Sequence, residues 1–414
     1  MPFTSFQLHD GLLQAIRLRG YANPTAIQQE AIPAILSGAD LIACAQTGSG
    51  KTAAFCLPLL QLWNASPAPR QARVLILVPT RELATQVGDT LRSLALQLAK
   101  PLKLAVLFGG VSINPQMLHL RGGADILVAT PGRLLDLIRQ NAVSLSAVST
   151  LVLDEADRLL EYGFADELNQ LLALLPAERQ NLLFSATFPS QLSELAQQFL
   201  HSPVHINVAT DAADKPDILQ RAIVIDTEQR TPLLRHLINS HQWKQVLVFC
   251  ASRYATELVA VKLRKARIAA EPFHGELSQG KRTQVLADFK AGRIRVIVAT
   301  DVAARGIDIN RLPVVINYDL PRSSDDYQHR IGRTGRAGES GLAISFISTG
   351  NEAHFRLIEK RQNIALEREQ LAGFEVTATE INAEDKLHGG IKGKRPNKKD
   401  KLRAQLAEKD FSGD

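Results

Sequence analysis

Aromatic residues and cysteines are scarce in this chain of 414 residues: aromatics make up 5% of the sequence, and the only cysteines are Cys44, Cys56 and Cys250. An odd number of scattered cysteines without a CxxC pair argues against a disulfide framework and a cysteine-based zinc site, and it fits a reducing compartment. No apolar run approaches the roughly 20 residues that a membrane-spanning helix needs. The opening "MPFTSFQLHD" lacks the basic start and apolar stretch of a signal peptide. We therefore expect a cytoplasmic protein that does not enter a membrane.

Positive charge is concentrated near the end of the chain. The net charge is +6, and residues 386–403 hold eight Lys/Arg side chains against one acid, Asp400, which gives this run a charge of +7. Residues 404–414 carry −2, so residues 1–385 are left near +1. Because a Gly/Lys-rich run has little apolar surface to bury, we expect residues 371–414 to be a basic, disordered tail. Such a tail is either a solubilising end or an electrostatic tether for a polyanion.

Short apolar runs alternate with longer amphipathic stretches through most of the chain. Uninterrupted apolar runs are typical of parallel strands that are buried on both faces, and stretches such as "LLDLIRQN" and "ELVAVKLRKA" between them predict helices. The alternation predicts an α/β fold with doubly wound parallel sheets, and the length favours two domains. The expected strands are "VLILVP" (74–79), "ADILVAT" (124–130), "TLVLD" (150–154), "NLLFSAT" (181–187), "QVLVFC" (245–250), "RVIVAT" (295–300) and "VVINYD" (314–319).

Two pairs of segments resemble each other across the chain. "VLILVPTREL" in the first half resembles "VLVFCASRYATEL" in the second, and "DILVATPGR" resembles "RVIVATDVAARG". Any two Val/Ile-rich strands look alike, but here each run also ends in a polar or glycine-rich loop, and parallel sheets bind ligands at those carboxyl ends. We expect one domain at residues 1–207 and a second at 218–370, joined by a small polar linker at 208–217.

The segment "AQTGSGKT", residues 45–52, predicts a phosphate-binding loop. It follows the apolar run "DLIAC" and precedes a helical stretch, which is the setting that such a loop requires. Backbone N–H groups around residues 48–50 would hold phosphate oxygens at a helix N-terminus. Lys51 would reach the β- and γ-phosphates, and the Thr52 hydroxyl would bind Mg²⁺. The motif departs from GxxxxGK[ST] at Ala45, and a flexible Gly/Ser turn is the alternative interpretation.

The segment "LVLDEAD", residues 151–157, supplies two adjacent carboxylates at the end of an expected strand. Asp154 would hold Mg²⁺ through water. Glu155 would orient and deprotonate an attacking water molecule. Adjacent acids at a strand end are usually only solvated, but the phosphate loop upstream favours the catalytic interpretation.

Residues 329–338, "HRIGRTGRAG", place three arginines three residues apart with glycines between them. Arginine is well shaped to bind phosphate or carboxylate, and glycine lets the backbone come close to a ligand. No phosphate loop lies near them in the sequence. They form either a basic surface loop or one side of an anion site whose other side lies far away in the chain.

The ordered set of motifs resembles the DEAD-box RNA helicases of superfamily two. The phosphate loop has the A-x-T-G-x-G-K-T variant that is common in that superfamily, and "DEAD" at 154–157 is the family's namesake signature. The resemblance covers about residues 3–350, and its wording is nearest to the bacterial RhlE-type branch. It implies two tandem RecA-like domains, with ATP and Mg²⁺ as cofactors and RNA as the partner. The other motifs, in family order, are "GYANPTAIQ" (20–28), "PTRELA" (79–84), "GG" (109–110), "TPGR" (130–133), "SAT" (185–187), "VATDVAARGIDI" (298–309) and "HRIGRTGR" (329–336).

The resemblance implies that ATP is bound by residues from both domains. Gln28 would read the adenine edge through its amide. Phe3 would stack on the adenine ring, and Phe6 is a rival that we assign to the core. Asp308 would bind the ribose hydroxyls. The expected ATP-binding residues are Phe3, Tyr21, Gln28, Gln46, Thr47, Gly48, Ser49, Gly50, Lys51, Thr52 and Asp308.

The resemblance also supplies the anion for the arginines. Arg333 and Arg336 would meet the γ-phosphate as arginine fingers, and with Lys51, Asp154 and Glu155 they make up the expected catalytic set. His329 and Arg330 would couple this site to the "DEAD" and "SAT" segments. The expected coupling residues are Asp157, Ser185, Thr187, His329 and Arg330.

RNA would bridge both domains through its sugar–phosphate backbone. Contacts to phosphate and 2′-hydroxyl groups distinguish RNA from DNA without reading sequence, and the few aromatic residues leave no long stacking platform. The expected RNA-binding residues are Arg81, Gly110, Thr130, Arg133, Gln279, Arg282, Thr300, Asp301 and Arg305.

The expected function is that of an ATP-dependent RNA helicase that unwinds short duplexes locally and acts in ribosome assembly or RNA turnover. Two alternatives stay open: an ATP-gated RNA clamp or assembly platform, and a DNA translocase. The sequence leaves the bound RNA, the protein partners and the oligomeric state undecided, with a monomer as the default.

Overall fold

The computed structural model describes residues 2–46, 48–65, 71–208, 217–304, 312–335 and 340–376. Several predicted features lie outside the described residues: Thr47, Arg305, Asp308 and Arg336, most of the expected linker, and the basic tail from residue 377 onward. No helix in the described ranges is long and apolar enough to cross a bilayer.

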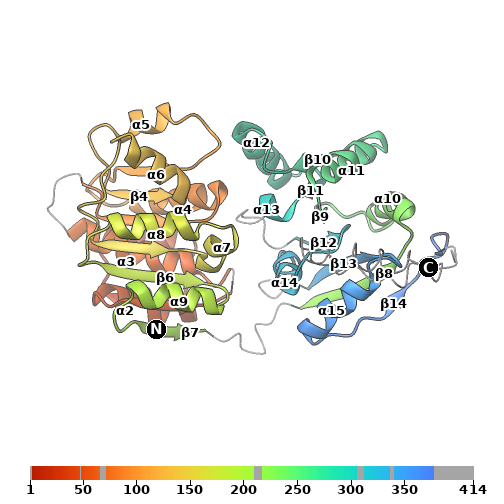
Figure 1. Cartoon of the computed structure of the whole chain (residues 1–414), viewed down its shortest axis with the longest axis horizontal. Helices are drawn as coiled ribbons and strands as arrows, with labels where there is room; N and C mark the ends of the chain where they lie inside the picture. The colour runs from red at the N-terminus through yellow and green to blue at the C-terminus, as the bar shows by residue number, and fades with distance from the viewer. Residues whose placement is uncertain are drawn as a thin grey trace, which may run out of the picture. The chain divides into compact units, whose positions relative to one another are not determined.

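The described part of the chain contains two parallel seven-stranded sheets (Figure 1). We call the elements up to β7 the first lobe and those from β8 to β14 the second lobe. The first sheet has the strand order β3-β4-β2-β5-β6-β1-β7. Its strands are β1 (Leu41–Cys44), β2 (Val74–Leu77), β3 (Leu104–Leu107), β4 (Ile126–Ala129), β5 (Thr150–Leu153), β6 (Gln180–Ser185) and β7 (Val204–Asn207).

The second sheet has the order β10-β11-β9-β12-β13-β8-β14. When its strands are renumbered from one, this order is identical to that of the first sheet. The expected similarity between the two halves of the chain is therefore confirmed. The segments "VLILVP" and "QVLVFC" form the equivalent strands β2 and β9, and the second pair of similar segments forms β4 and β11. The strands are β8 (Ile218–Val224), β9 (Val246–Phe249), β10 (Ala270–Phe273), β11 (Val296–Ala299), β12 (Val314–Asn317), β13 (Gly341–Ile347) and β14 (Arg368–Glu369).

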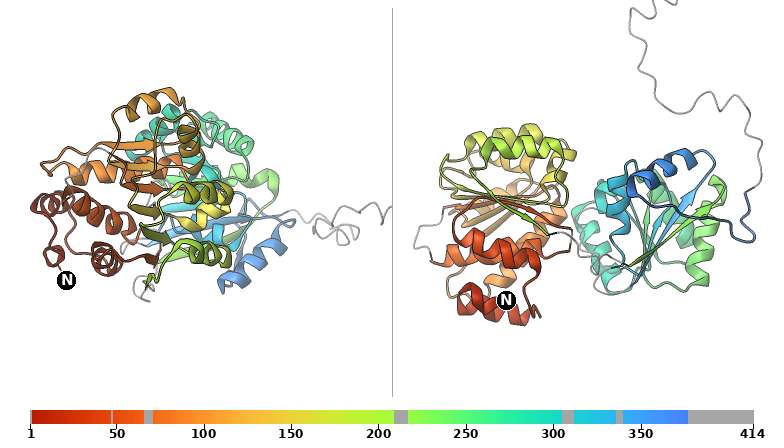
Figure 2. Two further views of the ribbon diagram at one scale, coloured as in Figure 1. Left: turned by 60° about the vertical axis from the view of Figure 1, so that its left-hand side comes forward. Right: turned by 90° about the horizontal axis from the view of Figure 1, so that it is seen from below.

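Helices cover both faces of the first sheet (Figure 2). Alternate strand residues belong to two different hydrophobic clusters: Ile76 and Val152 pack with α1 to α4, whereas Leu75 and Leu153 pack with α6 to α9. This two-sided burial explains why the strand sequences are apolar without interruption. The helices are α1 (Asp10–Leu18), α2 (Ala26–Leu36), α3 (Lys51–Ala65), α4 (Arg81–Ala95), α5 (Asn114–Leu120), α6 (Pro131–Arg139), α7 (Ala156–Glu161), α8 (Ala165–Leu174) and α9 (Ser190–Phe199).

One face of the second sheet packs against helices that include α12 and α15. Phe289 of α12 joins a cluster with Leu247, and Phe355 of α15 joins a cluster with Ala343. The helices of this lobe are α10 (Arg230–Ser240), α11 (Arg253–Lys265), α12 (Gln279–Lys290), α13 (Asp301–Ala304), α14 (Ser324–Ile331) and α15 (Glu352–Gln362). The predicted fold class of two doubly wound parallel sheets is confirmed.

The two lobes also start equivalent helices in the same way. Thr80 follows β2 and accepts a hydrogen bond from Leu83 N at 3.2 Å, which caps α4. Ser252 follows β9 and accepts from Ala255 N at 3.1 Å, which caps α11. Such caps satisfy N–H groups that have no partner within the helix. They fix helix starts at the carboxyl edge of each sheet, where the motif residues lie.

Candidate active site

The phosphate loop joins β1 to α3, and a hydrogen bond links its last residues to its first. Gly48 and Gly50 have φ angles of 87° and 95°, which favour glycine. Gly50 also has no room for a side chain, because a Cβ atom there would lie 2.5 Å from Gln28 Nε2. Lys51, buried at the start of α3, donates to the Ala45 carbonyl at 2.5 Å. Its ammonium group therefore lies at the loop, where a phosphate is expected to bind.

The other predicted residues of this loop have different exposures. Gln46 is exposed and Thr52 is half-buried in the first turn of α3. The Ser49 hydroxyl is buried and has no hydrogen-bond partner within the described ranges. A buried polar atom without a partner is unusual, and a phosphate oxygen at the loop would supply one.

Gln28 is buried, and its side-chain amide is hydrogen-bonded to the backbone of two segments. Its Oε1 accepts from Thr25 N at 3.1 Å as part of a capping box that starts α2. Its Nε2 donates to the Gly50 carbonyl at 3.2 Å. The sequence predicted an adenine-reading amide and did not predict this contact with the phosphate loop. Each end of the amide still has one hydrogen-bonding position for a base, a second lone pair on Oε1 and a second N–H on Nε2.

Phe3 and Phe6 are equally buried, at 6% and 7% exposure, in a short 3₁₀ helix (Phe3–Phe6). Their rings meet edge to face with centroids 6.2 Å apart. Phe6 is a core residue, as expected. Stacking of Phe3 on adenine stays a prediction, because its ring is packed in the same cluster. Tyr21 is half-buried against that cluster, and its hydroxyl accepts from Arg19 at 3.3 Å.

The two carboxylates of the "DEAD" segment have different surroundings. Asp154 is 2% exposed at the end of β5. The pKa of Asp154 is raised to about 7, chiefly by burial and also by the Glu155 carboxylate, while Lys51 acts in the opposite direction. Glu155 is half-buried and has a left-handed backbone with φ 49° and ψ 51°. This conformation is uncommon outside glycine and is often found at functional sites.

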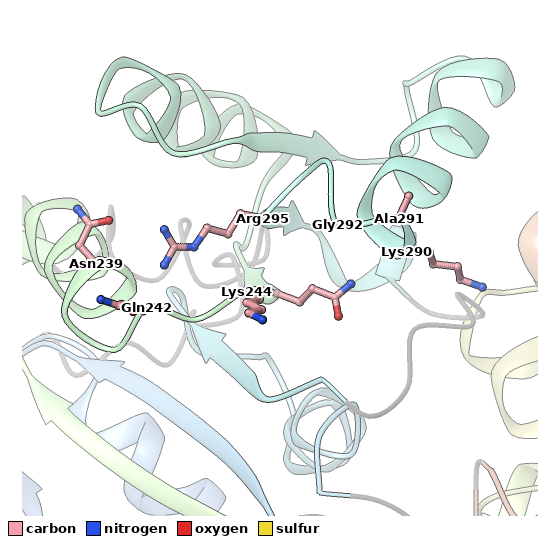
Figure 3. Close-up of a pocket in the computed structure, with 8 residues that line it drawn as sticks. Asn239, Gln242, Lys244, Lys290, Ala291, Gly292 and Arg295 are labelled. Atoms are coloured by element: carbon pink, nitrogen blue, oxygen red, sulfur yellow. The ribbon is translucent and has the colours of Figure 1, made fainter.

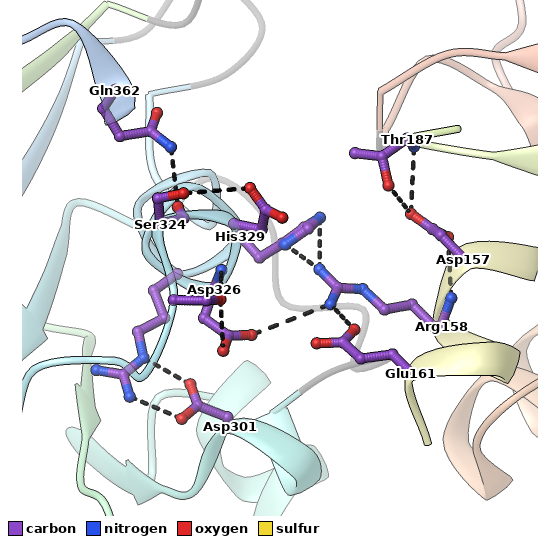
Figure 4. Close-up of polar contacts among 12 residues, drawn as sticks. Asp157, Arg158, Glu161, Thr187, Asp301, Ser324, Asp326, His329 and Gln362 are labelled. Atoms are coloured by element: carbon purple, nitrogen blue, oxygen red, sulfur yellow. Dashed lines mark hydrogen bonds and ion pairs between the residues drawn. The ribbon is translucent and has the colours of Figure 1, made fainter. Parts of the chain in front are cut away.

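Asp157 connects the "DEAD" segment to the "SAT" segment (Figure 4). Its Oδ2 accepts from Thr187 Oγ1 at 2.8 Å and from Thr187 N at 3.2 Å. Ser185 Oγ donates to the Thr187 carbonyl at 2.6 Å and accepts from Asp157 N at 3.3 Å. The structure thus brings together three of the five expected coupling residues.

The other two expected coupling residues, His329 and Arg330, lie on α14 and have different partners. His329 contacts Arg158, which directly follows Asp157, with 2.7 Å between Nε2 and Nη2 (Figure 4). The hydrogen bonds of Arg330 lie within the second lobe, so its coupling to Asp157 stays a prediction. Arg330 forms a two-bond ion pair with Asp301, at 2.5 and 2.7 Å.

Arg330 is 2% exposed and is surrounded by acceptors within the second lobe. Besides Asp301, it donates to Asn317 Oδ1 at 3.1 Å and to the Asp319 carbonyl at 2.6 Å. Asn317 in turn donates to Ser345 Oγ at 3.0 Å. Asn317 is not among the predicted site residues, although a polar residue inside the apolar run "VVINYD" indicates a buried hydrogen-bonding role.

Arg333 follows α14 and is 7% exposed. Its backbone N–H donates to the Arg330 carbonyl at 3.2 Å, and its carbonyl accepts from Leu312 N at 3.1 Å. The neighbouring Gly335 has φ 64°, and a Cβ atom there would lie 2.5 Å from a side-chain carbon of Ile218. Glycine is therefore required here for packing as well as for backbone conformation.

Three of the expected RNA-binding residues of the first lobe gather around the loop after β3. Gly110 has φ 76°, and a Cβ atom there would lie 2.6 Å from Arg81 Nη1. Arg133 donates to the Val111 carbonyl at 2.6 Å, and burial lowers the pKa of its guanidinium. Thr130 is buried at the start of α6.

The expected RNA-binding residues of the second lobe divide into two kinds. Gln279 and Thr300 are half-exposed at the starts of α12 and α13. Arg282 is 2% exposed and donates to neighbouring backbone, so its contact with RNA stays a prediction. Asp301 likewise directs both carboxylate oxygens to Arg330.

A polar hollow of about 680 Å³ lies elsewhere on the second lobe (Figure 3). Lys244, Lys290 and Arg295 are among its lining residues, and it sits at the amino ends of β9 and β11. None of the predicted site residues lines it. Within the described ranges, no group of three or more His, Cys, Asp or Glu side chains could hold a metal ion.

Comparisons with known proteins define the class of the chain. Residues 25–195 match the DEAD/DEAH box helicase family model, and residues 229–338 match the model of the helicase conserved C-terminal domain. Together with the two parallel sheets, these matches define a helicase with tandem RecA-like domains.

Individual relatives narrow the class further. The chain is 42% identical to "ATP-dependent rRNA helicase RRP3" of Gibberella zeae, over 84% of this chain and 71% of that protein. It is 38% identical to "DEAD-box ATP-dependent RNA helicase CshA" of Bacillus subtilis, over 89% of this chain and 74% of that protein. The solved structure of S. cerevisiae Dbp5 bound to RNA and ADP BeF3 matches 89% of this chain and 95% of that chain, with 29% identity and a TM-score of 0.79. The chain belongs to the DEAD-box family of ATP-dependent RNA helicases.

Proposed function

We propose that this protein binds ATP at the phosphate loop, holds RNA along both lobes, unwinds short RNA duplexes locally and hydrolyses ATP to release the RNA. One observation carries the proposal. The phosphate loop and the "DEAD" and "SAT" segments follow three adjacent strands, β1, β5 and β6, and are hydrogen-bonded to one another. Ala45 N donates to the Ser185 carbonyl at 3.1 Å, and Asp157 holds Thr187. A phosphate at the loop would therefore lie beside the carboxylates that hydrolysis requires.

Within this site each residue of the first lobe has a separate role. Lys51 would leave the Ala45 carbonyl and pair with the phosphates. Glu155 would accept the proton of the attacking water, since it is less buried than Asp154. The Asp157–Thr187 bonds would couple the ATP site to the loop after β6.

The residues fit a magnesium ion. Asp154 offers a buried carboxylate whose pKa is raised chiefly by burial and also by the neighbouring Glu155 carboxylate, and Thr52 adds a hydroxyl in the first turn of α3. Protein-bound Mg²⁺ usually takes one or two carboxylates together with substrate phosphates, so a larger acidic cluster is not needed. When bound, the ion would neutralise charge on the phosphates.

The second lobe would complete the site. Arg333 and Arg336 would stabilise the charge that develops on the γ-phosphate, and Asp308 would bind the ribose. Arg330 supports this arrangement indirectly, because its bonds to Asp301 and Asn317 hold α14 in place. RNA would contact Arg81, Gly110, Thr130 and Arg133 on the first lobe, and Gln279, Arg282, Thr300, Asp301 and Arg305 on the second.

The proposal also covers the branch of the family, the cellular location, the domain limits and the RNA pathway. The wording of the motifs supports membership of the bacterial RhlE-type branch, and the scattered cysteines support a cytoplasmic location. We further propose the domain limits 1–207 and 218–370, with RNA as the partner of a monomer in ribosome assembly or RNA turnover.

Strand displacement tests the proposal against an ATP-gated clamp. We expect the protein to release the short strand of a duplex of about ten base pairs when ATP is present, and to act poorly on a long duplex. RNA-stimulated ATP turnover without any strand release would favour the clamp. ATP turnover stimulated equally by DNA and RNA of the same sequence would favour a DNA translocase.

Gln28→Ala should weaken ATP binding more than it weakens GTP binding. Loss of a buried amide partner typically costs about 1–3 kcal/mol. The contact with Gly50 is lost for either nucleotide, so its effect cancels when the two are compared. The measurement is the Kd of ATP and of GTP for both proteins, and equal losses would mean that Gln28 does not read the base.

Removing the chain after residue 385 should flatten the salt dependence of RNA binding. Each lost contact with a single-stranded phosphate changes the slope of log affinity against log salt by about 0.7. ATP turnover at saturating RNA should persist, because the ATP-site motifs precede residue 340. A full-length chain with the eight basic residues of 386–403 replaced by glutamine should behave like the truncated one. Coincident salt series for truncated and intact chains would leave the tail without a role in RNA binding.

A further inference from the structure

The loop between β10 and α12, residues 274–278, is fastened to α11 by a buried histidine. His274 is 6% exposed, and its Nε2 lies 2.9 Å from Glu257 Oε1. Glu257 is on α11, and its side chain is 47% exposed. We call these two residues the His274–Glu257 pair.

In the described part of the chain, Glu257 is the hydrogen-bond partner of the His274 ring. The carboxylate is an acceptor, so Nε2 must carry the proton. The other ring nitrogen, Nδ1, is buried without a partner among the residues that the structure describes. Glu257 is therefore the polar group that holds the ring in place.

The backbone of His274 supports Arg282 in turn. The His274 carbonyl accepts from Leu277 N at 3.2 Å and from Arg282 Nη1 at 3.3 Å. Arg282 also donates to the Ala303 carbonyl on α13 at 3.4 Å. Its guanidinium lies 4.6 Å from the centroid of the Phe273 ring, and its Nε is 2.8 Å from Glu82. A shift of His274 would move Arg282 and hence the spacing of α12 and α13.

We propose that the His274–Glu257 pair is a positioning device for RNA. It sets the spacing between the starts of α12 and α13, where Gln279 and Thr300 lie. Neither member of the pair contacts RNA in this account, so both are positioning residues. The proposal rests on the RNA contacts proposed above for Gln279 and Thr300.

The same loop has a second link to α11 that serves as an internal control. Arg253 pairs with Glu276, and the two side chains are 62% and 63% exposed. Exposed ion pairs of this kind stabilise proteins little. The two links thus join the same loop to the same helix but differ in burial.

The experiment measures ATP turnover of the full chain against the concentration of a single-stranded oligouridine RNA. Glu257→Ala should raise the KM for RNA about tenfold, the effect of losing one charge-assisted hydrogen bond. The kcat at saturating RNA and the KM for ATP should stay within about twofold. Glu257→Gln keeps an acceptor for Nε2 and should restore most of the RNA affinity, whereas Glu276→Ala should have little effect.

A direct measurement of RNA affinity by fluorescence anisotropy separates positioning from general damage. If Glu257→Ala proves unstable, Glu257→Asp, which withdraws the carboxylate and keeps its charge, should still raise the Kd for RNA severalfold. The proposal is overturned if Glu257→Ala and Glu276→Ala raise the KM for RNA equally, or if kcat falls while RNA affinity is unchanged. Absence of RNA stimulation in the unmodified protein would instead overturn the proposed function, and the positioning role with it.

Discussion

Glu155→Gln should lower ATP turnover by about 10²–10⁴-fold, the range typical for loss of a general base, and should leave ATP and RNA binding nearly unchanged. Glutamine has the size and hydrogen-bonding capacity of glutamate but cannot accept the proton of the attacking water. Glu155 suits this role because it is less buried than Asp154 and has a strained backbone that directs its side chain from the start of α7. Single-turnover hydrolysis of bound ATP is the measurement.

The control for this substitution is Asp166→Asn on α8. Asp166 is exposed, so removal of its charge changes the net charge equally without touching the site. Its turnover should match that of the unmodified protein. Turnover by Glu155→Gln within a few fold of normal would remove Glu155 from the mechanism.

Arg333→Ala should lower turnover by about 10³-fold or more, as found for other arginine fingers in phosphoryl transfer. The side chain would act mainly in the transition state, where negative charge on the γ-phosphate is greatest, so ATP affinity should fall much less. Lysine in this position should recover only part of the rate, because it lacks the planar fork of donors.

Two comparisons make this result interpretable. Arg361→Ala removes an exposed arginine from α15 and should have no effect on turnover. Because Arg333 is 7% exposed, thermal unfolding should be recorded for each variant. A folded Arg333→Ala protein with nearly normal RNA-stimulated turnover would exclude a finger role.

The fold was predictable because the strands are buried on both faces. In β2, Ile76 packs against one helix layer and Leu75 against the other, and this demands a continuous apolar run such as "VLILVP". The similarity between segments of the two halves was also informative, because the similar segments form strands at equivalent positions in two sheets of identical order. Motif order then located the loops at the carboxyl edge of each sheet.

The partners of individual side chains were not predictable in the same way. Arg330 lies in the motif as expected, but spacing along one helix cannot show which distant carboxylate it will meet. In the fold the closest is Asp301. Gln28 is a similar case, because its contact with Gly50 depends on how α2 packs beside the phosphate loop. The burial of Arg282 likewise depends on tertiary contacts that no local pattern encodes.

The proposed ATP site needs residues from both lobes. The most direct test is steady-state ATP turnover by a fragment of residues 1–207 at saturating RNA, compared with the full chain and after confirming that the fragment binds ATP. We expect almost no RNA-stimulated turnover by the fragment, because Arg333 and Arg336 are missing. Full RNA-stimulated turnover by residues 1–207 alone would contradict this expectation.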